Sequence, residues 1–197
     1  MEYSLLTGLG LAAPAGLNAY LPLLVLALAD RISTDVTLAR PYGFLSSTWA
    51  IAVIVLLLTV ELVVDKVPGL DHANDLVQSA VRPAAGAVLV MAATSEGAGI
   101  NPVVSLVLGL LVAGAVHTAK AVVRPVVTLG TGGMGNPLLS LAEDMVAGLA
   151  AVVAVFLPVL SVGILLLFGA FVVWAIRKAR RPKRAVSAGN VSGSLRR

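Results

Sequence analysis

The chain has 197 residues, of which 58% are apolar even before its 19 glycines are counted. Only 12% of the residues are charged, and 8 of the 14 lysines and arginines lie within the last 21 residues. This composition excludes a soluble globular domain and predicts an integral membrane protein. The net charge of +4 lies mainly in the basic end and only 5% of the residues are aromatic, which argues against nucleic acid as a partner. The chain has no cysteine, so disulfides and thiolate metal sites are excluded.

The apolar stretches predict an all-α polytopic transmembrane helical bundle of about six spans, with five as the alternative. The expected spans cover residues 4–29, 49–64, 83–95, 102–116, 138–157 and 159–176. The first run is longer than the apolar core of a signal peptide and no Lys or Arg precedes it, so we expect it to be retained. The third run is short and contains Pro83 and Gly86, which predicts that it either tilts or is re-entrant.

The first apolar stretch contains residues that break helices. Pro14, Gly16 and Pro22 interrupt it, and Asn18 adds an amide group between them. Broken helices within the membrane are typical of transporters, so we expect a broken first helix with Asn18 at a binding site. The alternative is that Gly16 allows close helix packing and Asn18 makes one interhelical hydrogen bond.

The basic residues that follow the last span predict the orientation of the chain. They cluster in residues 177–184, and such a cluster is held on the cytoplasmic side of the inner membrane. Six spans then also place the N-terminus inside, although no Lys or Arg precedes the first span and Arg31 follows it. We expect residues 1–178 to form the transmembrane domain and residues 179–197 to form a disordered basic cytoplasmic tail.

Four carboxylates converge around one predicted turn after the second span. Glu61 and Asp65 share one helix face, a Pro-Gly pair ends that helix, and Asp71 and Asp75 share a face of the next. Such a group suits magnesium, especially at Asp71 and Asp75, or a proton or sodium relay. The alternative is that Asp71 caps the following helix, Asp65 is a solvated interface charge and Asp75 pairs with Arg82.

A basic stripe lies at the end of the fourth span. His117, Lys120 and Arg124 are spaced i, i+3, i+7 and therefore share one face of a helix. The stripe could bind a phosphate or carboxylate group, or it could neutralise the acidic residues. Both interpretations predict that it faces the interior of the bundle.

Two further carboxylates begin the fifth span. Glu143 and Asp144 follow a loop with four glycines between residues 130 and 135, whose amides could form an anion-binding nest. In an apolar helix these carboxylates need partners, and the basic stripe supplies them. The alternative is a capping box formed by Ser140 and Glu143.

Several short motifs carry a resemblance to a known family. They are Asn18-Ala-Tyr20-Leu-Pro22, Glu61-(x3)-Asp65-Lys66-Val-Pro68, Val-Arg82-Pro83, His117-(x2)-Lys120-(x3)-Arg124 and Ser140-Leu-Ala-Glu143-Asp144. With these motifs, in this order, the chain resembles a bacterial multi-pass membrane family, the domain of unknown function numbered 4126, over about residues 5–176. The resemblance implies a multi-pass architecture and no reaction.

An ionisable side chain in lipid is costly in free energy, so its presence suggests a function. We expect a small transporter or permease-like protein with a substrate site near the cytoplasmic side. Its residues would be Asn18, Glu61, Asp65, His117, Lys120, Arg124, Glu143 and Asp144. Its partners would be the lipid bilayer and a small anionic solute or lipid phosphate.

Two alternatives belong to other functional classes. One is an intramembrane enzyme that acts on a phospholipid or polyprenyl phosphate, with magnesium at Asp71 and Asp75. The other is a structural or assembly factor in which all the charges pair. No cofactor is expected apart from magnesium or a coupling cation, and the sequence does not decide the oligomeric state.

Overall fold

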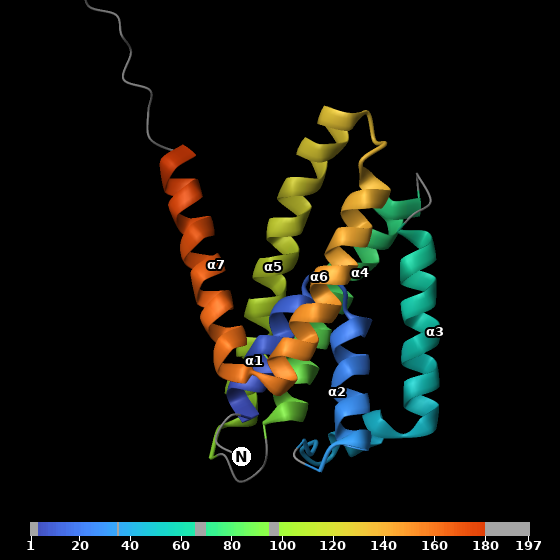
Figure 1. The fold of residues 1–197 in the computed structure, drawn as a ribbon, viewed down its shortest axis with the longest axis vertical. Helices are drawn as coiled ribbons and strands as arrows, with labels where there is room; N and C mark the ends of the chain where they lie inside the picture. The colour runs from blue at the N-terminus through green and yellow to red at the C-terminus, as the bar shows by residue number, and fades with distance from the viewer. Residues whose placement is uncertain (1–3, 35, 66–69, 95–98, 180–197) are drawn as a thin grey trace, which may run out of the picture. The chain divides into compact units, whose positions relative to one another are not determined.

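A computed structural model describes residues 4–34, 36–65, 70–94 and 99–179, and these ranges contain helices and no strands. Figure 1 shows the order of the elements. They are α1 (Ser4–Ala15), α2 (Tyr20–Ile32), the 3-10 helix η1 (Tyr42–Ser46), α3 (Thr48–Val64), α4 (Leu70–Ala93), α5 (Pro102–Thr131), α6 (Asn136–Phe156) and α7 (Pro158–Ala179). The predicted basic tail lies outside the described residues beyond Ala179.

The chain divides into two compact units, Met1–Leu165 and Leu166–Arg197. The second unit contains the C-terminal part of α7, where the rings of Phe171 and Trp174 are 5.9 Å apart. The ammonium group of Lys178 lies 4.8 Å from the centroid of the Trp174 ring. A tryptophan beside a lysine near a helix end is typical of a membrane interface.

The first apolar stretch forms a helical hairpin, α1–α2, with its turn at residues 16–19 (Figure 1). A Cβ on Gly8 of α1 would lie 2.9 Å from Cα of Val90. After α2, Ala39 donates its N–H to the carbonyl of Ala92 at 2.8 Å. Gly8 of α1 and Ala39, which follows α2, therefore both lie near the C-terminal end of α4.

This geometry corrects the prediction that residues 4–29 cross the bilayer once. The two helices have 12 and 13 residues, which makes each about 18–20 Å long, whereas a bilayer core is about 30 Å thick. The predicted break is present, and the chain reverses direction there. Gly16 lies at the turn, where a Cβ would be 3.0 Å from the backbone nitrogen of His117, so its lack of a side chain lets the turn touch α5.

Helix α4 corrects the prediction for the third apolar run. The expected short or re-entrant segment 83–95 is part of one continuous helix of 24 residues that passes through Pro83. Two polar residues that precede Pro83 face inward in this helix: Gln78 is 3% exposed and Arg82 is fully buried. Hydropathy alone cannot recognise such residues as part of a span.

Three described helical segments are long and apolar enough to cross a membrane: Leu76–Ala93, Pro102–Thr131 and Asn136–Phe156. The helices Ser4–Ala15 and Thr48–Val64 and the segment Pro158–Phe171 are apolar but shorter. The predicted count of six spans is therefore not confirmed, whereas the membrane-like, all-helical character of the described chain is.

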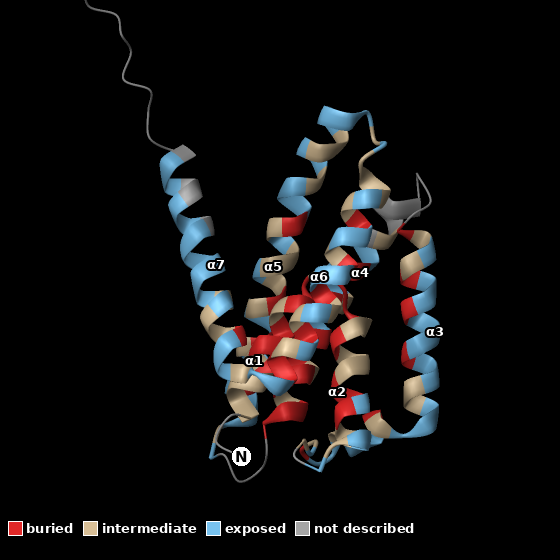
Figure 2. Ribbon diagram, viewed as in Figure 1, coloured by how far each residue is buried: buried red, intermediate tan, exposed pale blue. Residues whose placement is uncertain are grey.

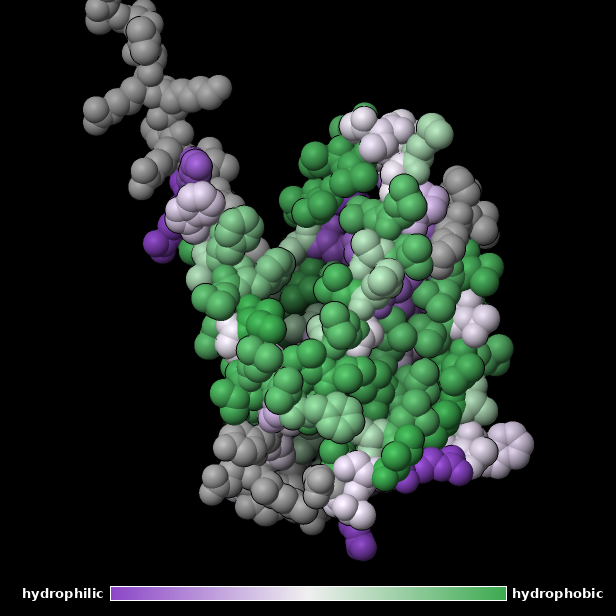
Figure 3. Space-filling view, in the orientation of Figure 1, coloured by the Kyte–Doolittle hydropathy of each residue, from purple (hydrophilic) through white to green (hydrophobic). Residues whose placement is uncertain are grey.

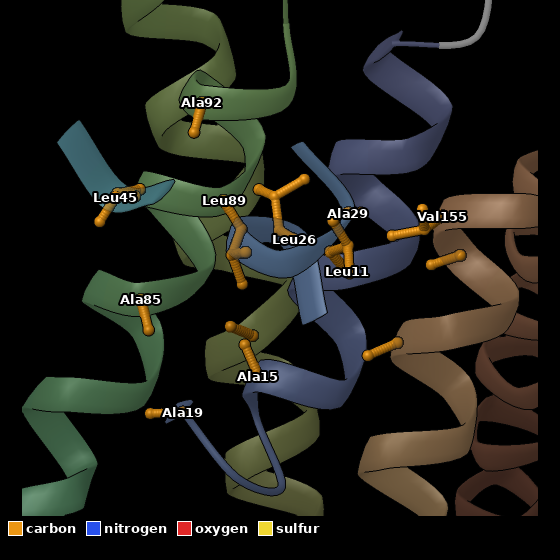
Figure 4. Close-up of a cluster of buried hydrophobic side chains, with 13 residues drawn as sticks. Leu11, Ala15, Ala19, Leu26, Ala29, Leu45, Ala85, Leu89, Ala92 and Val155 are labelled. Carbon is orange, nitrogen blue, oxygen red and sulfur yellow. The ribbon is translucent and has the colours of Figure 1, made fainter. Parts of the chain in front are cut away.

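Helix α1 lies at the centre of the first unit, in contact with α4, α5 and α6. Buried residues gather there and exposed ones lie on the outer faces (Figure 2). The core is built largely of alanine, with Leu11, Leu26 and Leu89 between the helices (Figure 4). The outer faces are apolar: α3 exposes Val60 and Val63 but buries Glu61. A helix that exposes valine and buries a carboxylate is suited to lipid.

Helices α4 and α5 touch through two glycines, which leads to a prediction about stability. A Cβ on Gly109 would lie 2.7 Å from Cα of Ala87 and would collide with the backbone oxygen of Gly86. We expect Gly109→Ala to lower the free energy of unfolding in detergent micelles by about 1–3 kcal/mol, as overpacking does. The matched control is Gly114→Ala on the same helix, because its Cβ would meet only Cγ of Pro83 at 3.9 Å. Equal stability of the two variants would contradict the close contact.

Candidate functional site

Arg82 of α4 is fully buried and connects three helices. One of its terminal nitrogens lies 3.0 Å from Oε1 of Glu61 and 3.9 Å from Oδ2 of Asp65. The other lies 3.3 Å from Nδ1 of His117 on α5. A guanidinium group only donates hydrogen bonds, so Nδ1 must accept and the imidazole carries its proton on Nε2. Glu61 is 2% exposed, so Arg82 supplies the counter-charge that a buried carboxylate requires.

Asp65 ends α3 and connects that helix to three others. Its Oδ1 accepts a hydrogen bond from the amide of Asn74 at 2.6 Å. Its Oδ2 lies 3.4 Å from the hydroxyl of Ser140 on α6 and 3.5 Å from the guanidinium of Arg124 on α5. Asp65 is 5% exposed, so the interpretation as a solvated interface charge is wrong.

Lys120 connects α5 to α6 and to the turn of the hairpin. Its ammonium lies 2.9 Å from Oε2 of Glu143 and donates to the carbonyl of Leu17 at 3.0 Å. Leu17 follows the last turn of α1, where carbonyls lack an intrahelical partner and carry partial negative charge. Arg124 also approaches Glu143, at 3.7 Å.

Asn18 fixes the other side of the hairpin turn. Its amide nitrogen donates to Oδ1 of Asp144 on α6 at 3.0 Å. Its Oδ1 accepts from the backbone N–H groups of Tyr20 and Leu21, each at 3.0 Å. Asn18 therefore satisfies two backbone donors at the start of α2 while it holds the turn against α6.

Ser140 and Glu143 do not form the capping box that was one interpretation of this segment. Helix α6 begins at Asn136, its N-cap is Gly135, and no side chain caps it. Ser140 and Glu143 lie one to two turns further along. Their side chains face the residues of α3 and α5 described above, because a charged group inside an apolar bundle is most stable beside its counter-charge.

The eight residues predicted to form a site thus lie together around the hairpin turn, and the basic stripe faces the bundle. They come from the turn at residues 16–19, α3, α5 and α6. The side chains of Asp71 and Asp75 lie outside the described residues, so their predicted metal site stays a prediction. Among the side chains whose placement is described, no group of three or more His, Asp or Glu is arranged to hold a metal ion.

A cavity of about 570 Å³ lies against this network, between α4, α5 and the start of α6. All three residues of the basic stripe line it, together with the polar residues Ser79, Thr128 and Asn136 and the apolar residues Leu76, Ala121, Pro125 and Leu129. In Figure 3, hydrophilic side chains are recessed between the apolar surfaces of α5 and α6. The cations therefore face carboxylates on one side and a cavity on the other.

Sequence reasoning missed Arg82 as a site residue, and it also missed the polar lining of the cavity. A signal for Arg82 was available, because Asn74, Gln78 and Arg82 are spaced four apart and form a polar stripe on one helix face. No comparable signal marked the carbonyl of Leu17, since backbone groups carry no sequence information.

Comparison with known proteins places the chain in a family. The chain has no match among curated proteins and no match among solved structures. Residues 5–178 match the family described as "Domain of unknown function (DUF4126)", which covers every helix of the site. The chain therefore belongs to the DUF4126 family.

Proposed function

We propose that this protein is a small transporter or permease-like protein that binds an anionic solute in the cavity beside its basic stripe. One observation carries the proposal: Lys120 and Arg124 line the cavity while they contact Glu143 and Asp65. An anion that enters the cavity must compete with these carboxylates for the same cations. A purely structural network would have no need of a cavity at its cations.

The distances indicate which cation would change partner first. The contacts of Arg124 with Asp65 and Glu143 are 3.5 and 3.7 Å long, beyond the range of about 2.7–3.2 Å of a good hydrogen bond. The contact between Lys120 and Glu143 is 2.9 Å. A solute would therefore draw Arg124 away from its carboxylates at a lower cost in free energy than Lys120. Protonation of a carboxylate would release its cation to the solute, which would couple a proton to the transported anion.

The hairpin turn is the candidate moving part. Lys120 holds the carbonyl of Leu17, and Asp144 holds Asn18, so these two hydrogen bonds tie the turn to the network. A solute that draws Lys120 toward the cavity would weaken its bond to Leu17. Discontinuous helices whose ends meet a charged site are a recurrent transporter device.

Alternating access can be tested without knowing the solute, because the chain has no native cysteine. A single cysteine replaces Ala121, an exposed residue of the cavity wall. A membrane-impermeant maleimide is then applied to each side of sealed vesicles that contain the protein. We expect Ala121→Cys to react from both sides, since a transporter exposes its site alternately.

Two control positions define the sides in this experiment. Val103 at the start of α5 is 66% exposed, and Met134 beyond its end is 86% exposed. Each cysteine variant should react from one side only, and the two sides should differ. If Ala121→Cys reacts only from the side of Met134→Cys, transport is excluded. A one-sided site would then favour the enzyme or the structural protein.

The inner-membrane location and the cytoplasmic C-terminus also stay predictions, which rest on the basic residues after residue 176.

A further inference from the structure

The cavity has the donors that a phosphate group requires. An ammonium has three donors; that of Lys120 donates to the carbonyl of Leu17 and forms an ion pair with Glu143. Arg124 adds a planar guanidinium, whose geometry matches the oxygens of phosphate. His117 adds an imidazole to the lining, and Ser79 adds a hydroxyl oxygen whose proton is donated to the carbonyl of Leu76 at 2.6 Å. Several donors of this kind suit an anion with several oxygens better than a halide.

Part of the cavity lining is apolar. Leu76 comes from α4, and Ala121, Pro125 and Leu129 come from α5, the helix that also carries the cations. The volume of about 570 Å³ falls in the range of about 300–1,000 Å³ that is usual for organic ligands. A single inorganic anion would leave most of this space and all of the apolar wall without contact.

The cavity lies in the C-terminal half of α5. With a rise of about 1.5 Å per residue, His117 lies roughly 22 Å and Arg124 roughly 33 Å from Pro102. With Pro102 at one edge of a hydrocarbon core about 30 Å thick, the stripe would run from within the core to its other edge. Val122 and Val126, next to the cavity residues Ala121 and Pro125, are 67% and 69% exposed. The neighbouring surface of α5 is thus suited to lipid chains.

We propose that the cavity binds a phosphate group carried on an apolar chain, so that the substrate class is a phosphorylated amphiphile of the bilayer. The proposed binding does not depend on transport; only the statement that this ligand is the transported substrate rests on the transport function proposed above. The phosphate lies against Arg124, Lys120 and His117, and the apolar chain leaves along α5. Inorganic phosphate shares the headgroup chemistry but makes no use of the apolar wall.

The test measures binding to the purified full-length chain in an uncharged detergent by isothermal titration calorimetry. The probes are dioctanoyl phosphatidic acid and inorganic phosphate. The variants are Leu129→Glu and Leu129→Gln, which differ by one charge at a cavity residue that is 87% exposed and therefore of little importance for folding. We expect phosphatidic acid to bind Leu129→Glu at least tenfold more weakly than Leu129→Gln, because the carboxylate repels the phosphate.

A control separates the cavity from general attraction to cations. Arg177 is exposed at the end of α7 and does not line the cavity. Arg177→Gln should bind phosphatidic acid like the unchanged chain, whereas an equal loss in Arg177→Gln and Leu129→Glu would overturn the proposal. Inorganic phosphate should bind at least tenfold more weakly than phosphatidic acid. Equal binding of the two probes would keep phosphate as the ligand chemistry and overturn the lipid as its source.

The outcome is distinguishable from failure of the transport proposal. Binding in detergent does not depend on access from two sides, so specific binding with one-sided labelling of Ala121→Cys would keep the site and exclude transport. Two-sided labelling without phosphate-dependent binding would keep transport and overturn the substrate class.

Discussion

Replacing Arg82 by methionine should lower the free energy of unfolding by about 3–5 kcal/mol, the usual cost of removing one partner of a buried ion pair. The side chains of Arg82 and Glu61 are 0% and 1% exposed. Without the guanidinium, the Glu61 carboxylate would remain buried, with one oxygen that already has no hydrogen-bond partner among the described residues. Unfolding by a denaturing detergent in mixed micelles measures the effect.

A double variant shows whether the loss comes from the uncompensated charge. Arg82→Met combined with Glu61→Gln removes both charges, so we expect it to be more stable than Arg82→Met alone. The control is Arg31→Met, because Arg31 is exposed and its guanidinium donates to the hydroxyl of Thr48 at 3.2 Å. Its effect should stay within about 0.5 kcal/mol. An Arg82→Met variant as stable as Arg31→Met would contradict the buried pair.

Replacing Lys120 by methionine should be the second most damaging change, at about 3 kcal/mol, because Glu143 keeps a second cation. The remaining contact, with Arg124, is 3.7 Å long. The carbonyl of Leu17 also loses its bond from the ammonium, so the hairpin turn loses one of its two attachments to the network. The exposed Lys178 supplies the control, since Lys178→Met changes a surface contact with Trp174.

A double variant separates the structural role of Lys120 from its role in binding. Lys120→Met with Glu143→Gln leaves no uncompensated charge at this pair and should regain most of the lost stability. Its binding of dioctanoyl phosphatidic acid should nevertheless stay at least tenfold weaker than that of the unchanged chain. A stable double variant that binds normally would show that Lys120 serves folding alone.

These predictions share one physical basis. Ionisable side chains are costly in an apolar bundle, and a buried carboxylate there is stabilised by a group of opposite charge from another helix. Glu61 depends on Arg82, and Glu143 depends on Lys120 and Arg124. Removing one member therefore costs far more than removing an exposed charge, whichever function the network serves.

The sequence by itself determined the class of the protein and much of its site. An apolar composition is incompatible with a soluble core, Pro14 and Gly16 together disfavour a continuous helix through residues 14–16, and a charge in lipid requires a partner. These are properties of single residues and of spacings within one helix. They sufficed to select Asn18, Glu61, Lys120 and Glu143 for one cluster.

Only the tertiary structure decided how the helices run and what each charge touches. Residues 4–29 were predicted to form one span, yet the chain reverses direction within them, because the turn is fixed by Lys120 and Asp144, more than 100 residues away in the chain. The third apolar run was predicted to begin at residue 83, yet α4 is continuous through Arg82, whose side chain meets Glu61, Asp65 and His117. The cavity likewise depends on the packing of α4, α5 and α6. Contacts between residues distant in sequence leave no local pattern, so hydropathy and spacing could not have shown them.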